Sequence, residues 1–176
     1  MSCTNTVAVL VSACLAGGLA GCAPTAKAPA ADHTSDVAAI TALDNQDVAY
    51  IVAHQYEKFG ATYAADGISV SPGAPVAQGP QAIAKSFAPF ANDPAYDFKF
   101  TLNRVEVSKD GSMAYDVWRY DQTSTDSKTH KVVHEIGSGM DALRKGDDGT
   151  WKFVASINTP SPDAPGTVAA PATTKP

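Results

Sequence analysis

The chain has 176 residues, of which 44% are hydrophobic and 18% are charged, and these values suit one globular domain. Its formal net charge is −5 and it has no run of Lys or Arg, so it lacks the basic patch that binds a phosphate backbone. We therefore expect no nucleic-acid partner. Its three cysteines are Cys3, Cys14 and Cys22, so the rest of the chain has no thiol for a disulfide, a metal site or a nucleophile.

The N-terminal segment has the pattern of a secretory signal. Residues 7–21 are uncharged, too short to span a bilayer as a stable helix, and rich in small residues at their end. Residues 19–22, LAGC, resemble the lipobox of bacterial lipoproteins, which implies that Cys22 receives a lipid and becomes the first mature residue. We therefore expect a signal peptide at 1–21 and a protein anchored to the outer membrane on its periplasmic side. The alternative is an ordinary secretory signal with an incidental cysteine, because no Lys or Arg precedes the apolar run.

Segments rich in Pro and Ala flank the part of the chain that we expect to fold. Residues 22–34 lack large apolar side chains, which predicts a flexible tether. Residues 159–176 contain five prolines and predict a disordered tail. The folded domain is therefore expected at residues 35–158.

Three helices are expected at the start of the domain. The first begins near Asp36, after the N-cap candidates Thr34 and Ser35. The second lies within residues 55–67 and is followed by a brief strand, and the third lies at residues 81–90, after a proline. One face of the first helix follows helical spacing and is apolar except for two carboxylates: Val37, Ile40, Asp44, Asp47, Val48 and Ile51.

The second half of the chain predicts a run of long antiparallel strands at residues 98–107, 112–122, 130–145 and 150–158. The apolar alternation slips by one residue near Asn103 and Arg104, which indicates a β-bulge. Gly137 and Gly139 indicate a bend or a close backbone approach. Helices followed by such strands predict an α+β fold, with helices packed on one face of a curved sheet.

This order of elements, with the stretches 39–53, 63–83 and 146–158, resembles the SnoaL-like branch of the ketosteroid isomerase and nuclear transport factor 2 superfamily, and within it a large domain family of unknown function. The resemblance implies a cone-shaped α+β barrel, with three N-terminal helices packed on a curved antiparallel sheet and a pocket open at one end. It also implies a homodimer through the outer sheet face. It implies no particular reaction, because this fold hosts isomerases, hydrolases, cyclases and non-catalytic modules. No cofactor motif is present, so we expect no cofactor.

Asp47 is the candidate catalytic residue. A carboxylate on a buried stripe must be paired, hydrogen-bonded or shifted toward its neutral form, and a raised pKa suits a general base. Asp44, one turn earlier, is expected to matter less to ligand binding. In the alternative interpretation, one of the two lies in water at the helix edge and the other is a structural partner of an Arg, a Tyr or a backbone amide.

Further residues are expected to line the pocket. They are His54, Asp116, Trp118, Tyr120 and Asp141. The opposite face of the Trp118 strand could line the pocket instead, because a one-residue slip exchanges the two faces. Core and dimer packing is an alternative role for its aromatic residues, and His54 could simply interact with the helix dipole.

The histidine pair His130 and His134 does not predict a metal site. On a strand the two imidazoles would lie roughly 13 Å apart, too far to share one ion. We therefore expect no metal ligand.

We interpret the chain as a cell-envelope lipoprotein whose domain binds a small apolar or amphipathic ligand. One alternative is a cofactor-independent isomerase, cyclase or hydrolase that uses a pocket carboxylate. Another is a non-catalytic dimeric interaction module in the envelope. A desolvated carboxylate in an aromatic-lined cavity would favour the enzyme, and a filled cavity would favour the interaction module.

The lipobox predicts acylation at Cys22. In cells of a bacterium that processes lipoproteins, labelled palmitate should enter the wild-type chain and not Cys22→Ala, because only the thiol of that cysteine accepts the diacylglyceryl group. Equal labelling of both chains would remove the prediction.

Overall fold

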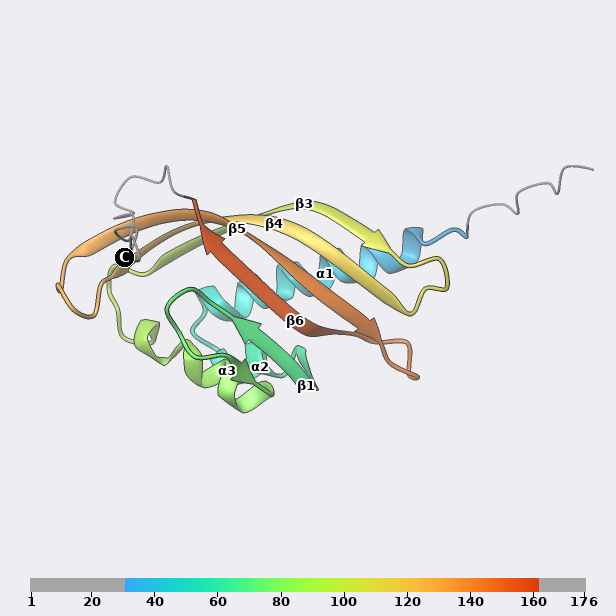
Figure 1. Cartoon of the computed structure of the whole chain (residues 1–176), viewed down its shortest axis with the longest axis horizontal. Helices are drawn as coiled ribbons and strands as arrows, with labels where there is room; N and C mark the ends of the chain where they lie inside the picture. Colours follow the sequence, from blue (N-terminus) through green and yellow to red (C-terminus); the bar gives the residue numbers. More distant parts are fainter. Residues whose placement is uncertain (1–30, 162–176) are drawn as a thin grey trace, which may run out of the picture.

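The computed structural model describes residues 31–161. Figure 1 shows the long helix α1 (Thr34–Val52) lying across one face of a curved sheet. The short helices α2 (Tyr56–Gly60) and α3 (Pro80–Ser86) lie at the bottom of the view, beside the strand labelled β1. A single 3₁₀ turn, η1 (Ala88–Phe90), follows α3. Cys22 and the predicted signal, most of the tether and nearly all of the tail lie outside the described residues. No helix within residues 31–161 is long and apolar enough to cross a membrane.

The sheet is mixed and open. Its strands are β1 (Tyr63–Val70), β2 (Ala77–Gln78), β3 (Asp97–Val107), β4 (Met113–Thr125), β5 (Val132–Lys145) and β6 (Trp151–Pro160). The spatial order is β2-β1-β6-β5-β4-β3, and β1 runs parallel to β6 while every other neighbouring pair is antiparallel. The α+β class is confirmed. The cone-shaped barrel with an antiparallel sheet is confirmed only in part: the sheet is curved, but β2 and β3 end it without pairing to each other, and β1 runs parallel to β6.

The second predicted helix is shorter than expected. It ends at Gly60, and β1 begins at Tyr63, inside the range predicted to be helical. Thr62 closes the last turn, because its hydroxyl donates to the carbonyl of Phe59. Tyr63 then pairs with Phe153 of β6, and this long-range pairing overrides the local helical pattern. The strand expected before the third helix is present as β1, which begins earlier than predicted, and β2 follows it before α3.

Most of the predicted strand details are confirmed. The register of β3 against β4 shifts between Leu102 and Arg104, as the slip in apolar alternation predicted. The strand β6 ends at Pro160, two residues into the predicted tail, where it pairs with Gly137 of β5. The buried apolar residues lie between the helices and the sheet and include Ile40, Phe59, Ile83, Leu143 and Phe153.

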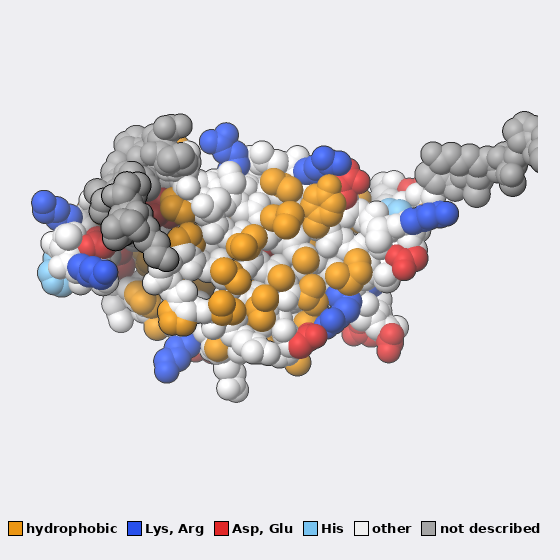
Figure 2. Space-filling view, in the orientation of Figure 1, with side chains coloured by type: hydrophobic (Ala, Val, Ile, Leu, Met, Phe, Trp, Pro, Cys, Tyr) orange, Lys and Arg blue, Asp and Glu red, His pale blue; other side chains and the backbone are white. Residues whose placement is uncertain are grey.

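The outer face of the sheet carries an apolar row. Met140 and Ile157 face each other on β5 and β6 and are 47% and 49% exposed, and Val117 of β4 lies beside Met140. Figure 2 shows hydrophobic side chains spread across this side of the molecule. The predicted homodimer through this face stays a prediction.

Asp36, in the first turn of α1, forms hydrogen bonds with the end of β5 and the start of β6. Its Oδ1 accepts hydrogen bonds from Lys145 Nζ at 2.6 Å and from Trp151 Nε1 at 3.2 Å. The hydrogen bond from Lys145 is the main cause of the lowered pKa of Asp36. Val37, which the predicted stripe placed inside, is 36% exposed, because α1 turns Asp36 and Ile40 toward the sheet instead.

We predict that Asp36→Asn lowers the free energy of unfolding at pH 7 by about 1–3 kcal/mol, because Lys145 loses its charged acceptor. Since the pKa of Asp36 is lowered, the difference between the two proteins should shrink as the pH falls below about 4. Urea denaturation of both proteins at each pH measures the difference in the free energy of unfolding. Asp66→Asn, which removes an exposed partner of Arg144, is the control and should change little. Equal midpoints for Asp36→Asn and wild type would contradict the prediction.

Candidate functional site

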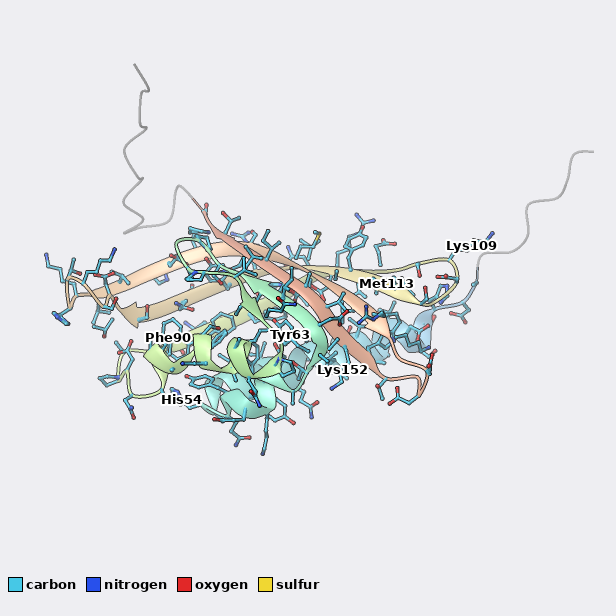
Figure 3. The ribbon with its side chains drawn as sticks, turned by 60° about the horizontal axis from the view of Figure 1, so that its bottom comes forward. His54, Tyr63, Phe90, Lys109, Met113 and Lys152 are labelled. Atoms are coloured by element: carbon cyan, nitrogen blue, oxygen red, sulfur yellow. The ribbon has the colours of Figure 1, made fainter. Side chains whose placement is uncertain are left out.

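A cavity of about 340 Å³ lies between the helical layer and the inner face of the sheet. Eight aromatic residues line it, and they come from α2, β1, the α3–η1 segment, β3 and β4: Phe59, Tyr63, Phe87, Phe90, Phe98, Phe100, Trp118 and Tyr120. In Figure 3, Tyr63 and Phe90 lie on the helical side of the sheet. The cavity is therefore mostly apolar, and it has the size and the lining of a small-molecule site.

Three buried aspartates meet at one side of this cavity. Asp44 comes from α1, and Asp116 and Asp141 lie directly opposite each other on β4 and β5. Their exposed fractions are 2%, 0% and 7%. One carboxylate oxygen of each lies within 4.8 Å of the others. We call these three residues the aspartate cluster.

The aspartate cluster has too few hydrogen-bond partners for three ionised carboxylates. Asp141 Oδ2 accepts from Trp118 Nε1 at 2.9 Å, and Asp116 Oδ1 accepts from the backbone N–H of Asp141 at 3.3 Å. Three of the other four oxygens, Asp44 Oδ2, Asp116 Oδ2 and Asp141 Oδ1, are buried without a partner among the described residues. Three adjacent negative charges without compensation are not stable in such a place, so protons or a cation must neutralise part of the charge.

Burial raises the pKa of every member of the aspartate cluster. The pKa is about 7 for Asp44 and about 7 for Asp141, and desolvation is the largest cause for both. The pKa of Asp116 rises to about 9, first by desolvation and then by the charges of Asp141 and Asp44. The aspartate cluster therefore retains protons at neutral pH, where three aspartates in water would have released theirs.

Asp47 lies next to the aspartate cluster on α1 and lines the cavity. Its side chain is half-buried, and its Oδ1 lies 2.7 Å from Thr62 Oγ1, whose single hydroxyl proton is shared between Asp47 and the carbonyl of Phe59. Desolvation raises its pKa well above the usual value, although the Thr62 hydrogen bond opposes the shift. Asp47 is thus another carboxyl group that favours its protonated form.

Two glycines let two aromatic rings lie flat across β5. Trp118 is opposite Gly139, and Tyr120 is opposite Gly137. A Cβ atom on either glycine would overlap the facing ring. Each ring crosses its glycine and donates a hydrogen bond to a carboxylate on β5. Trp118 Nε1 donates to Asp141 Oδ2, and the hydroxyl of Tyr120 donates to Glu135 Oε1 at 2.6 Å.

The chain matches the SnoaL-like domain family over residues 36–154. It belongs to the SnoaL-like domain family. No match to a curated protein sequence was found.

Solved structures share the fold of this SnoaL-like domain. A ketosteroid isomerase-like protein from Erwinia carotovora is 23% identical, with a TM-score of 0.63 over 72% of this chain and 98% of that one. A protein from Catenulispora acidiphila in complex with S-DNPA is 16% identical, with a TM-score of 0.58 over 72% and 94%. An NTF2-like protein with a cystatin-like fold from Novosphingobium aromaticivorans is 18% identical, with a TM-score of 0.58 over 74% and 84%. These identities support a common fold alone.

The structure brings most of the sequence-predicted site residues to the cavity. Asp47, Trp118, Tyr120 and Asp141 line it, so of the two faces that the sequence left open for β4, the one with Trp118 and Tyr120 lines the cavity. Asp116 is on the same face of β4, directly opposite Asp141 of β5, but it is fully buried and is not among the lining residues. The functional role of all these residues stays a prediction.

His54, which the sequence predicted to line the pocket, is not among the residues that line this cavity. His54 has a φ of 54° just after α1 ends, and its Nδ1 lies 2.8 Å from the hydroxyl of Tyr56. Figure 3 shows His54 at the periphery of the helical layer. The irregular backbone turns this side chain toward Tyr56 and Tyr96, away from the cavity.

The sequence analysis missed three features of the cavity. Asp44 is deeper than Asp47, although it was expected to matter less. Glu135 lines the cavity, although it was considered only as a neighbour of the histidines, and Phe98 and Phe100 line it from β3. The available signal was the spacing Glu-x-Gly-x-Gly-x-Asp at 135–141, in which the glycines make room for facing rings. His134 instead pairs with Asp121 on the surface.

The raised pKa values predict that the SnoaL-like domain is more stable in mild acid. The folded domain holds protons on the aspartate cluster that the unfolded chain releases near pH 4. The free energy of unfolding should therefore fall as the pH rises from about 5 to about 9. Asp116→Asn, which carries a neutral group at every pH, should weaken this dependence and stabilise the domain at pH 8 by about 1 kcal/mol.

Thermal and urea unfolding between these pH values measure the effect. Asp97→Asn, which removes an exposed carboxylate paired with Lys99, is the matched control and should leave the slope unchanged. Parallel stability curves for wild type and Asp116→Asn would show that Asp116 is ionised in the folded state.

Proposed function

We propose that the SnoaL-like domain binds a small, largely apolar molecule and catalyses a cofactor-independent proton transfer on it. The observation that carries the proposal is the position of Asp44 and Asp141, which are buried beside an aromatic-lined cavity and each have one oxygen without a partner. Such groups combine a desolvated environment with a pKa near neutrality, which suits general acid–base chemistry. Of the three functions considered from the sequence, this arrangement favours the enzyme.

The hydrogen bonds suggest a division of roles. Asp141 is the better base, because the Ser156 hydroxyl and the Trp118 N–H both favour its ionised form against desolvation. The hydrogen bond from Trp118 also fixes its orientation, and Oδ1, which has no partner among the described residues, can accept a proton. Asp44 has no hydrogen-bond donor to stabilise its charge, so it is the better acid toward a developing oxyanion on the substrate. Asp116 stays protonated and limits the negative charge of the cluster. The reaction class is proton abstraction next to a carbonyl, followed by return of a proton to oxygen or carbon.

Binding without chemistry is the second candidate function. It is supported by the apolar lining and by the Catenulispora acidiphila structure of the same fold, which is in complex with a small molecule. The aspartate cluster argues against it, since an apolar ligand alone needs no buried carboxyl groups and apolar residues in their place would cost less.

We also propose that a lipid on Cys22 holds the domain at the periplasmic side of the outer membrane. The support is the LAGC motif after an uncharged apolar run. The proline- and alanine-rich residues that follow Cys22 would give the domain reach from the membrane surface.

A base-sensitive probe tests the proton transfer. We predict that the full chain accelerates ring opening of 5-nitrobenzisoxazole, a neutral aromatic compound that reports on a carboxylate base in an apolar pocket. The value of kcat/KM should rise with pH and level off above about pH 7, because the base is active when ionised. Asp141→Asn should lower it about 100-fold or more.

The controls separate the site from the protein surface. Asp121→Asn, outside the cavity, should retain the wild-type rate. Asp44→Asn should reduce the rate less than Asp141→Asn does, because this probe needs no acid at its leaving oxygen. A rate that does not depend on pH, or that survives Asp141→Asn, would contradict the proposed function.

A further inference from the structure

Charged side chains of only one sign line the cavity. Among the 25 residues that line it, four carry carboxyl groups (Asp44, Asp47, Glu135 and Asp141) and none is Lys, Arg or His. Two of the four, Asp44 and Asp141, are more than nine-tenths buried and keep an oxygen without a partner. The field inside the cavity therefore opposes an anion and favours a cation.

The aromatic rings that line the cavity also favour a cation. The face of an aromatic ring carries negative partial charge and attracts a cation placed above it. Trp118 lies 5.6 Å from Phe100 and 5.9 Å from Tyr120, measured between ring centroids, and Tyr120 also stacks with Phe98. These four rings form a continuous surface on β3 and β4, which we call the aromatic wall.

Two rings of the aromatic wall are joined to carboxyl groups. Trp118 donates its indole N–H to Asp141, and Tyr120 donates its hydroxyl to Glu135. A donor that is hydrogen-bonded to a carboxylate makes its ring more electron-rich, which strengthens the attraction for a cation. Gly137 and Gly139 hold this arrangement open, because a side chain at either position would displace a ring.

We propose that the ligand of this cavity is a small organic cation, an amine or ammonium compound with an apolar body, held between the aromatic wall and the carboxyl groups of Asp141 and Glu135. The inference rests on the proposed function only in that a small molecule occupies the cavity. The inference adds that this molecule carries a positive charge, and proton-transfer chemistry does not require such a charge.

Three probes of similar shape test the charge directly on the full chain. Phenyltrimethylammonium, tert-butylbenzene and 4-tert-butylbenzoate present a cation, a neutral isostere and an anion. In calorimetric titration at pH 8, the cation should bind about tenfold or more tighter than the neutral isostere, and the anion should not bind. Equal or tighter binding of tert-butylbenzene, or any binding of the benzoate in the cavity, would overturn the proposal.

Variants locate the effect. Glu135→Gln and Asp141→Asn should each reduce the preference for the cation over its isostere, whereas Glu106→Gln, an exposed carboxylate on β3, should leave it unchanged. The ratio of the two affinities is the readout, so a general loss of folding does not imitate the result. A ratio that survives both cavity variants would place the cation elsewhere and overturn the proposal.

Proton release gives an independent readout. The carboxyl of Asp141 faces Asp44 and Asp47 of α1, Asp116 of β4 and the hydroxyl of Tyr63 of β1, all of which favour their protonated forms. A cation beside Asp141 favours its ionised form, so binding near pH 7 should release protons, whereas the neutral isostere should release none. Titrations in two buffers of different ionisation heat measure this release, and its absence would contradict the proposal.

The results for the cation probes and for ring opening together distinguish a cationic ligand from proton transfer, and added metal ions distinguish both from a metal site. If the protein prefers the cation but does not open the ring of 5-nitrobenzisoxazole, the cationic-ligand proposal stands and the proton-transfer proposal is contradicted. If it opens the ring but shows no preference for the cation, the proton-transfer proposal stands and the cationic-ligand proposal is contradicted. Binding of Mg²⁺ or Ca²⁺ that excludes phenyltrimethylammonium would overturn the organic-cation proposal, because carboxylate oxygens also suit these ions.

Discussion

Carboxyl groups removed from water must lose their charge or share it, and this requirement shapes the centre of the SnoaL-like domain. Asp44, Asp116 and Asp141 are each at most 7% exposed, and no Lys, Arg or His is among the described residues that line the neighbouring cavity. Hydrophobic residues of similar size would be cheaper for stability at these positions. The domain therefore keeps a strained electrostatic arrangement beside its cavity, as proteins do where function competes with stability.

The surrounding structure keeps this arrangement in place. Asp44 is fixed by α1, whose first turn is held to the sheet through Asp36, Lys145 and Trp151. Asp116 and Asp141 are fixed by their direct opposition on β4 and β5. Carboxyl groups held by three separate elements cannot move apart to relieve their repulsion, so protonation or a bound cation has to do so.

The sequence predicted the features that depend on local pattern, and it missed those that depend on distant contacts. Alternation alone placed the β3 bulge and the inner face of β4 correctly. The end of α2 was missed, because the pairing of Tyr63 with Phe153 involves residues far apart in the chain. The depth of Asp44 was also missed, since helical spacing shows which residues share a face but not which of them lies beneath the sheet. His54 lies outside this cavity because a single residue with positive φ redirects a side chain without any periodic signal.

The bulge in β3 has a consequence for how copies of the domain meet. β3 is a sheet edge of eleven residues, and its free backbone groups could pair with a strand from another molecule. Residues on both sides of the bulge carry exposed ion pairs, Asp97 with Lys99 and Arg104 with Glu106. The irregular register and the clustered charges together make β3 a poor template for a neighbouring strand, so the edge is protected against sheet extension and aggregation.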